Sequence, residues 1–150
     1  MKLDPELQEC LRDEVAAFLD RLGESPARNL YTPLAPAVAA GEVPDDLLDP
    51  LGRVLELSLG SGRLRKMHGP TAEAAAARLF WRTPRGATVK RTFDEVNKAL
   101  IGLQGQTIRS IDLTPRIPGA YAVTVETDRC RVRLSIDESG AQCQGVEVGF

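Results

Sequence analysis

Residues 121–136 read YAVTVETDRCRVRLSI, and this stretch decides the fold. Apolar and polar side chains alternate on both sides of Thr127-Asp128, which is the pattern of two half-buried strands joined by a tight turn. The second strand has an apolar face and an arginine-rich face; the apolar side chains are Cys130, Val132, Leu134 and Ile136. The stretch therefore predicts an antiparallel hairpin with one face against a core and the other toward water.

The alternation extends in both directions along the chain. Residues 108–113 predict a preceding strand, separated from the hairpin by a Pro-Gly turn at 118–119. A fourth strand follows the polar loop at 137–140, and its alternation slips at 144–145, which indicates a β-bulge. Residues 106–150 thus predict a four-stranded antiparallel β-meander.

The residues before the meander have helical periodicity. A first helix is predicted over 4–22, with an Asp-Pro start and a glycine stop. An alanine-rich helix is predicted to open at Gly69-Pro70, and a further helix at the capping box of 92–95. These last two helices are expected to pack on the sheet. The chain is therefore predicted to be a single α+β domain, with a mainly helical N-terminal portion over 1–104 packed on the C-terminal meander.

One segment before the alanine-rich helix has two interpretations. Residues 54–63 read VLELSLGSGR, an apolar run with Glu56 followed by Gly60 and Gly62. This resembles the first motif of S-adenosylmethionine-dependent methyltransferases. That family places glycine where this chain has Ser58, and it needs a second strand ending in an acid roughly 20 residues on. We therefore interpret the segment as a helix that ends at Gly60, keep a strand as the alternative, and expect no cofactor.

Composition narrows the class of protein. The 150 residues are 43% hydrophobic and 27% charged, which is ordinary for a soluble globular chain. No apolar run approaches the roughly 18 residues of a membrane helix, and acids stand where a secretory signal would be basic. We therefore expect a cytoplasmic protein without membrane contact. The single histidine, His68, and the three cysteines lack metal-ligand spacing, so no metal is expected. Cys143 is expected opposite Leu134 and not opposite Cys130, which argues against a disulfide.

Charge is distributed unevenly along the chain. Residues 1–50 carry eleven acids and four bases, whereas residues 51–116 carry five acids and twelve bases. One interpretation is a surface that binds nucleic acid or a phosphorylated ligand through residues 63–91. The other, which we favour, is that the acidic first third of the chain folds against the basic middle and neutralises it, with Asp13, Glu14 and Asp20 of the first helix as the expected partners.

Six cationic side chains are the candidate groups for binding an anion or a partner. They are Arg63, Arg65, Lys66 and His68 in the densest basic run, and Arg131 and Arg133 on the outer face of the third strand. A turn at Thr127-Asp128 would place Arg129 opposite Glu126, so that Arg131 and Arg133 lack acidic partners.

The sequence contains no nucleophile elbow, paired-histidine motif or phosphate loop. We therefore expect no catalytic residues, and we expect a binding or accessory module that acts through protein contacts, with a partner or with a second copy of itself. The expected surface is the Arg131/Arg133 face or a C-terminal edge strand ending in Phe150. Binding of nucleic acid or a phosphorylated ligand through residues 63–91 is the alternative, and a small enzyme without a recognisable motif is the third.

Overall fold

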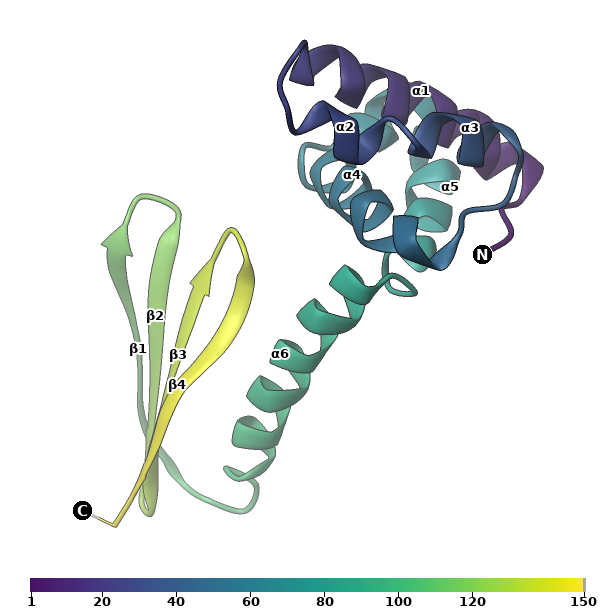
Figure 1. The fold of residues 1–150 in the computed structure, drawn as a ribbon. Coiled ribbons are helices and arrows are strands. Elements are labelled where there is room, and N and C mark those ends of the chain that lie inside the picture. Colours follow the sequence, from purple (N-terminus) through teal and green to yellow (C-terminus); the bar gives the residue numbers. More distant parts are fainter. Residues whose placement is uncertain (150) are drawn as a thin grey trace. The chain divides into compact units, whose positions relative to one another are not determined.

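The computed structural model describes residues 1–149, and the chain divides into two compact units (Figure 1). The first unit, Met1–Ala87, is helical, and the second, from Thr88 onward, combines a helix with a sheet. The predicted α+β class, a helical N-terminal portion followed by an antiparallel meander, is confirmed. The boundary between the units lies inside helix α6 (Pro84–Ile101), and not at the change from helix to strand near residue 105. That the units form one domain stays a prediction.

Five α-helices and a short 3-10 helix lie within the first unit. They are α1 (Pro5–Leu22), α2 (Arg28–Tyr31), α3 (Leu34–Ala39), η1 (Asp45–Leu47), α4 (Leu48–Gly60) and α5 (Arg63–Phe80). Helix α1 packs against α3, α4 and α5, and α4 packs against α5. Leucines from four of these helices have no exposed surface or almost none: Leu11, Leu34, Leu51, Leu55 and Leu64. This core orders the first unit.

The segment 54–63 forms the end of α4 and the turn into α5. The side chains of Val54, Leu55 and Ser58 are buried, as the helical interpretation requires. Gly62 then adopts φ +68°, a left-handed conformation that favours glycine, immediately before α5 begins. The strand alternative is therefore wrong, and the glycines separate two helices.

Helix α5 begins earlier than predicted. Gly69 has φ 87° and ψ 174°, so the expected start at Gly69-Pro70 is a kink, and residues 63–68 before it are also helical. Helix α5 packs against α1 and α4 within the first unit. Its short alanine side chains allow close approach to α4, and the side chains of Ala76 and Leu79 are buried within the helical unit. The expectation that α5 also packs on the sheet stays a prediction.

Helix α6 also begins earlier than predicted. Thr83 precedes it, and the Gly86 N–H donates to the Thr83 Oγ1 at 3.1 Å, which caps the helix with Pro84 at its first position. Thr92 lies in the middle of α6, where its hydroxyl donates to the Val89 carbonyl at 2.7 Å. The predicted capping box at 92–95 is therefore wrong, because the actual start signal is the Thr-Pro pair upstream.

The second unit contains one four-stranded sheet in the order β1-β2-β3-β4, with every neighbouring pair antiparallel. Its strands are β1 (Ile108–Ile117), β2 (Ala120–Thr127), β3 (Cys130–Asp137) and β4 (Gly140–Val148). Leu134 pairs with Cys143, and Arg133 pairs with Gly145, so Gln144 is an extra residue in β4. The predicted meander and its bulge are confirmed. All three cysteines are free.

Helix α6 covers part of one face of this sheet, which we call the inner face. Val96 and Ala99 of α6, and Leu103 in the turn after it, pack with the buried strand residues Cys130, Val132 and Leu134 of β3. A helix is about 10 Å wide and strands lie about 4.8 Å apart, so one helix covers roughly two strands. The packed strand residues belong to β2, β3 and β4, and the β1 side chains lie outside this core.

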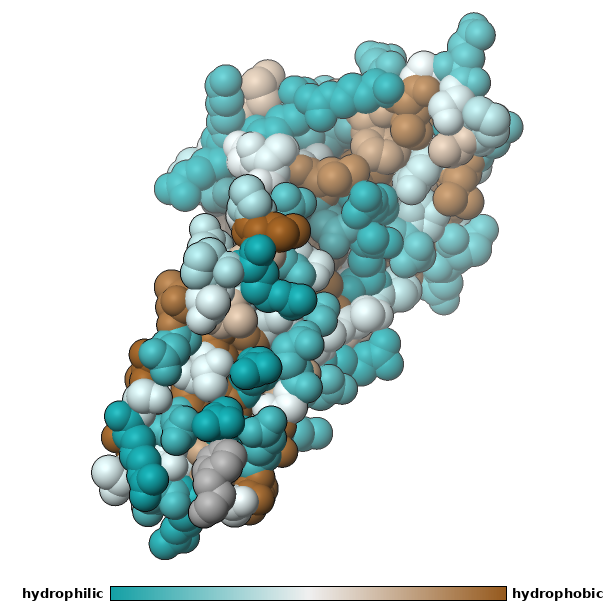
Figure 2. Space-filling model, turned by 90° about the vertical axis from the view of Figure 1, so that its left-hand side faces the viewer, coloured by the Kyte–Doolittle hydropathy of each residue, from teal (hydrophilic) through white to brown (hydrophobic). Residues whose placement is uncertain are grey.

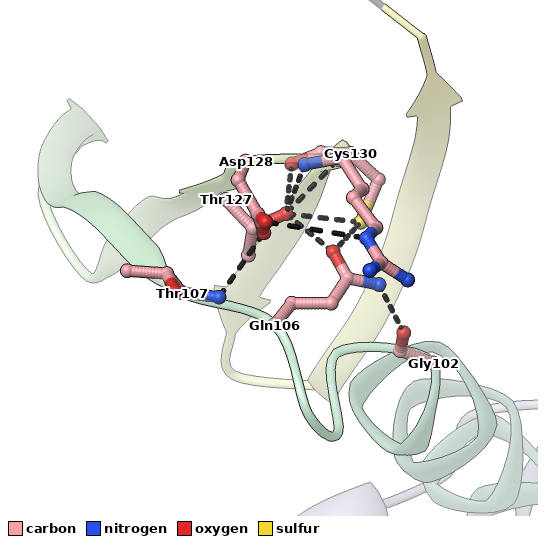
Figure 3. Close-up of polar contacts among 7 residues, drawn as sticks. Gly102, Gln106, Thr107, Thr127, Asp128 and Cys130 are labelled. Atoms are coloured by element: carbon pink, nitrogen blue, oxygen red, sulfur yellow. Dashed lines mark hydrogen bonds and ion pairs between the residues drawn. The ribbon is translucent and has the colours of Figure 1, made fainter.

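A polar network holds the end of α6 to the β2–β3 turn (Figure 3). The Gln106 side chain donates to the Gly102 carbonyl at 2.7 Å and accepts from Thr127 Oγ1 at 2.6 Å. Thr127 Oγ1 also accepts from the Cys130 N–H at 2.9 Å, and the Thr107 N–H donates to Asp128 Oδ1 at 3.1 Å. The network fixes the position of the helix on the inner face.

Candidate functional site

The cations of the predicted basic run are largely occupied within the first unit. Arg63 Nε lies 3.1 Å from Glu14 Oε1, and His68 Nε2 lies 3.6 Å from the same oxygen. Arg65 lies 3.7 Å from Glu73. Lys66 is exposed, and no ion pair of Lys66 is found within residues 1–149. The acidic first helix and α5 therefore supply counter-charges to this run.

Glu14 is the centre of this arrangement, with a side chain only 2% exposed. The Ser58 hydroxyl donates to Glu14 Oε2 at 2.7 Å, and Arg63 donates to both carboxylate oxygens. A buried carboxylate is costly unless it is paired and hydrogen-bonded. The Glu14 carboxylate therefore links α1 to Ser58 of α4 and to Arg63 of α5.

A cavity of about 260 Å³ lies between α1 and α5 beside this cluster. Its polar lining residues are Glu6, Glu9, Cys10, Asp13, His68 and Thr71. Burial, followed by the charges of Glu14 and Asp13, raises the pKa of the Cys10 thiol to about 11. The thiol is thus protonated at neutral pH, so the pair of Cys10 and His68 does not provide a thiolate nucleophile.

Metal-ligand clusters and membrane-spanning helices are two further features that bear on function. Among residues 1–149, no group of three or more histidine, cysteine, aspartate or glutamate side chains is placed to hold a metal ion. None of the helices in that same range combines the length and apolar character needed to cross a bilayer.

On the sheet, the ion-pair partners of Arg131 differ from the prediction. It pairs with Glu126 across the β2–β3 ladder at 3.0 Å and reaches Glu147 of β4 at 3.3 Å. The predicted Arg129–Glu126 pair and the unpartnered Arg131 are therefore wrong. Thr127 remains in the strand and its Oγ1 accepts the backbone N–H of Arg129, so the turn lies one residue later. Each cross-strand partner is shifted by two residues as a result.

Arg133 lies in a concavity on the outer face, the face of the sheet opposite α6. The concavity has a volume of about 350 Å³ and receives side chains from all four strands. Its polar lining residues are Thr114, Arg116, Thr124, Arg133, Ser135 and Gln144. Within residues 1–149, no ion pair of Arg116 or Arg133 is found. The prediction singled out Arg133 and missed the other five.

Irregular pairing places two of these side chains in the concavity. Pro115 pairs with Tyr121 and Ile117 pairs with Ala120, so Arg116 is an extra residue in β1, as Gln144 is in β4. Bulges re-aim side chains and are common next to functional sites. The alternation of β4 revealed the bulge at Gln144, whereas Pro115 breaks the apolar pattern of β1 and hides the bulge at Arg116.

The inner face has a second feature, an uncovered apolar patch on β1 and β2. It consists of Ile108 (54% exposed), Ile111 (61%), Leu113 (66%) and Tyr121 (43%). Hydrophobic side chains reach the surface among polar ones on the sheet-bearing part of the molecule (Figure 2). The three patch residues on β1 lie outside the core that α6 covers, and Tyr121 lies on β2 beside them. The predicted C-terminal edge strand is β4, which lies at the edge of the sheet, and Phe150 lies outside the described residues.

No family model, curated protein or solved structure matches this chain.

Proposed function

We propose that this chain is a non-catalytic binding module that acts through protein contacts, and that its partner is a second copy of itself. The observation that carries the proposal is the uncovered apolar patch formed by Ile108, Ile111, Leu113 and Tyr121. A contiguous apolar patch on a small unit favours association, because its burial removes apolar surface from water.

The chemistry of the patch favours a second copy as the occupant. A two-fold interface brings the same surface together from both chains, so like charges would face each other if the patch were charged. Ile111 and Leu113 share the inner face with their β2 partners Val125 and Val123. These four residues are apolar, and an uncharged apolar surface is complementary to itself.

Face-to-face packing is favoured over pairing through the sheet edge. Edge strands recruit other strands when they are long and regular, whereas bulges and proline discourage such pairing. Strand β1 contains Pro115 and a bulge at Arg116, and β4 contains the bulge at Gln144. Two sheets that pack face to face lie about 10 Å apart with their apolar side chains between them. Such packing would cover the part of the inner face that α6 leaves exposed.

The test is the mass of the full chain in solution, measured by light scattering across a concentration series. The wild-type chain is expected to reach the mass of a dimer as its concentration rises. Leu113→Lys and Ile111→Lys are expected to remain monomeric, because each places two charges in a two-fold apolar interface. Both side chains are largely exposed, so folding should tolerate the substitutions.

Leu30→Lys is the matched control, because Leu30 is 60% exposed but belongs to the first unit. It is expected to dimerise like the wild type, and circular dichroism checks that every variant is folded. A wild-type chain that is monomeric at all concentrations contradicts the proposal, as does loss of the dimer in Leu30→Lys alone.

The cytoplasm is the compartment that we propose for this module. Free thiols at Cys10, Cys130 and Cys143 suit a reducing compartment, where cysteines do not need partners.

A further inference from the structure

We propose that the outer-face concavity is a binding site for a small phosphorylated sugar or related phosphorylated polyol. The site lies on the face of the sheet opposite the apolar patch, so it does not depend on self-association. Its polar lining groups are the two guanidinium groups of Arg116 and Arg133, three hydroxyl groups and the Gln144 amide.

The two arginines indicate the anionic part of the ligand. A guanidinium group presents donors in a planar fork that matches a phosphoryl group. Arg131 is occupied by two carboxylates, whereas no ion pair of Arg116 or Arg133 is found among the described residues. Hydrogen bonds from Ser139 lower the pKa of Asp137, and the charge of Arg116 lowers it further. Arg116 thus has a carboxylate in its neighbourhood but keeps its donors available for an oxyanion.

The remaining lining groups indicate the rest of the ligand. Hydroxyl and amide side chains both donate and accept, so they match the hydroxyl groups of a sugar. The Gln144 side chain donates to Ser135 Oγ at 2.9 Å, which orders it at the wall of the concavity and leaves its carbonyl oxygen for a ligand. Among residues 1–149, no aromatic side chain lines the concavity, so these residues offer no platform for a stacked nucleobase.

The backbone provides the space for a ligand. Small-molecule sites usually have volumes of roughly 300–1,000 Å³, and this concavity has about 350 Å³. Ala122 is the small residue in its lining, and Gly145, opposite Arg133, has open space where a Cβ would lie. The bulges at Arg116 and Gln144 add one polar side chain from each edge strand. The small residues Ala122 of β2 and Gly145 of β4 leave space beside the longer polar side chains, which makes a hollow that fits a polar ligand.

The experiment titrates the full chain with glucose 6-phosphate and ribose 5-phosphate by calorimetry, with glucose and inorganic phosphate as the partial ligands. At least one sugar phosphate is expected to bind about tenfold more tightly than inorganic phosphate. Glucose alone is expected not to bind. Amide chemical shifts of β2 and β3 residues on the outer face should change with the sugar phosphate.

Two substitutions test the residues. Arg133→Gln is expected to weaken sugar-phosphate binding by about tenfold or more, and Thr124→Val by about threefold. Arg129→Gln is the matched control, because the Arg129 side chain is 73% exposed on the same unit but lies outside the concavity. It is expected to leave binding unchanged.

Three results would overturn the inference. The first is that neither sugar phosphate binds. The second is equal affinity for inorganic phosphate and the sugar phosphates, which would mean that the hydroxyl side chains of the concavity do not contact the sugar. The third is an equal loss in Arg129→Gln and Arg133→Gln, which would indicate general attraction to a positive surface. Monomer and dimer are both expected to bind, so failure of the dimer proposal is distinguishable from failure here.

Discussion

The thiol of Cys10 lies beside two carboxylates and away from solvent, and these surroundings determine its reactivity. Burial raises its pKa to about 11, and the charges of Glu14 and Asp13 contribute to the rise. A thiol with a raised pKa holds its proton to higher pH, so its thiolate fraction at pH 8 falls on the order of 100-fold below that of a free cysteine.

Alkylation with iodoacetamide at pH 8, followed by peptide mass mapping, is expected to modify Cys143 well before Cys10. Cys143 is only partly buried, whereas Cys10 is 3% exposed. Denatured protein serves as the control, in which both thiols should react at similar rates. Modification of Cys10 at the rate of Cys143 in the folded protein would mean that the α1–α5 cavity is more open than described.

At the scale of elements, the junction between α5 and α6 depends on Gly86. A Cβ at this position would overlap the Phe80 carbonyl oxygen and would lie 2.7 Å from the Phe80 carbonyl carbon and 2.8 Å from Trp81 Cα. These are backbone atoms of the turn between the helices, which a side-chain rotation cannot move. The close approach allows the Gly86 N–H to reach the hydroxyl of Thr83.

Gly86→Ala is therefore expected to destabilise the protein by about 2 kcal/mol, within the range for overpacking. Gly60→Ala is the matched control, because Gly60 lies in α4 and has nothing within 4 Å of an added Cβ. It is expected to be neutral or stabilising by up to roughly 1 kcal/mol. Urea unfolding followed by circular dichroism measures both, and equal midpoints would contradict the role of Gly86.

The errors in the sequence-based prediction of the elements have local causes. In the sequence, Thr83-Pro84 is compatible both with the end of one helix and with the start of the next. In the structure, the Thr83 N–H donates to the Phe80 carbonyl in the turn after α5, and α6 begins at Pro84. Thr127-Asp128 has a turn composition, but the Thr127 hydroxyl binds the backbone beyond it and moves the turn by one residue. Alternation of apolar and polar side chains predicted all four strands. Hydrogen bonds between side chain and backbone set the boundaries, and they are not visible in a pattern of apolar residues.

The residues of the candidate sites were harder to predict from the sequence than the helices and strands. Alternation places Arg133 on the outer face from sequence alone. Its companions Thr114 and Arg116 come from β1, and their proximity depends on cross-strand register and on a bulge next to a proline. The pairing of Arg63 with Glu14, 49 residues apart, follows from the packing of α5 against α1 and α4. The sequence predicted that Asp13, Glu14 and Asp20 of the first helix pair with the basic segment, and Glu14 does so. It did not predict which basic residue each acid contacts.

At the scale of the whole molecule, the uneven charge along the chain is offset by pairing in the first unit. Arg63, Arg65 and Arg85 of the basic segment each lie within ion-pair distance of a carboxylate. Partial burial alone would raise the pKa of Glu56, but hydrogen bonds from Arg85 and Arg53 lower it below its usual value. Glu56 therefore stays charged at neutral pH and continues to pair with these arginines.

For this reason a random single-stranded oligonucleotide is expected not to bind at an ionic strength of about 0.15 M. Fluorescence anisotropy across a salt series measures this. Binding that is steeply salt-dependent and is reduced by Lys66→Gln and Arg78→Gln, but not by Arg133→Gln, would support the nucleic-acid alternative through residues 63–91.

The extra residue of β4 has a consequence for how this strand tolerates a change in length. Losing one residue from a strand normally turns every later side chain to the opposite face. Without Gln144, however, Ala141, Cys143, Val146 and Val148 would follow strict alternation on the face that they occupy now. A chain without Gln144 should keep its hydrophobic pattern and lose only one polar side chain from the concavity that contains Arg116 and Arg133. The fold itself therefore does not require this residue.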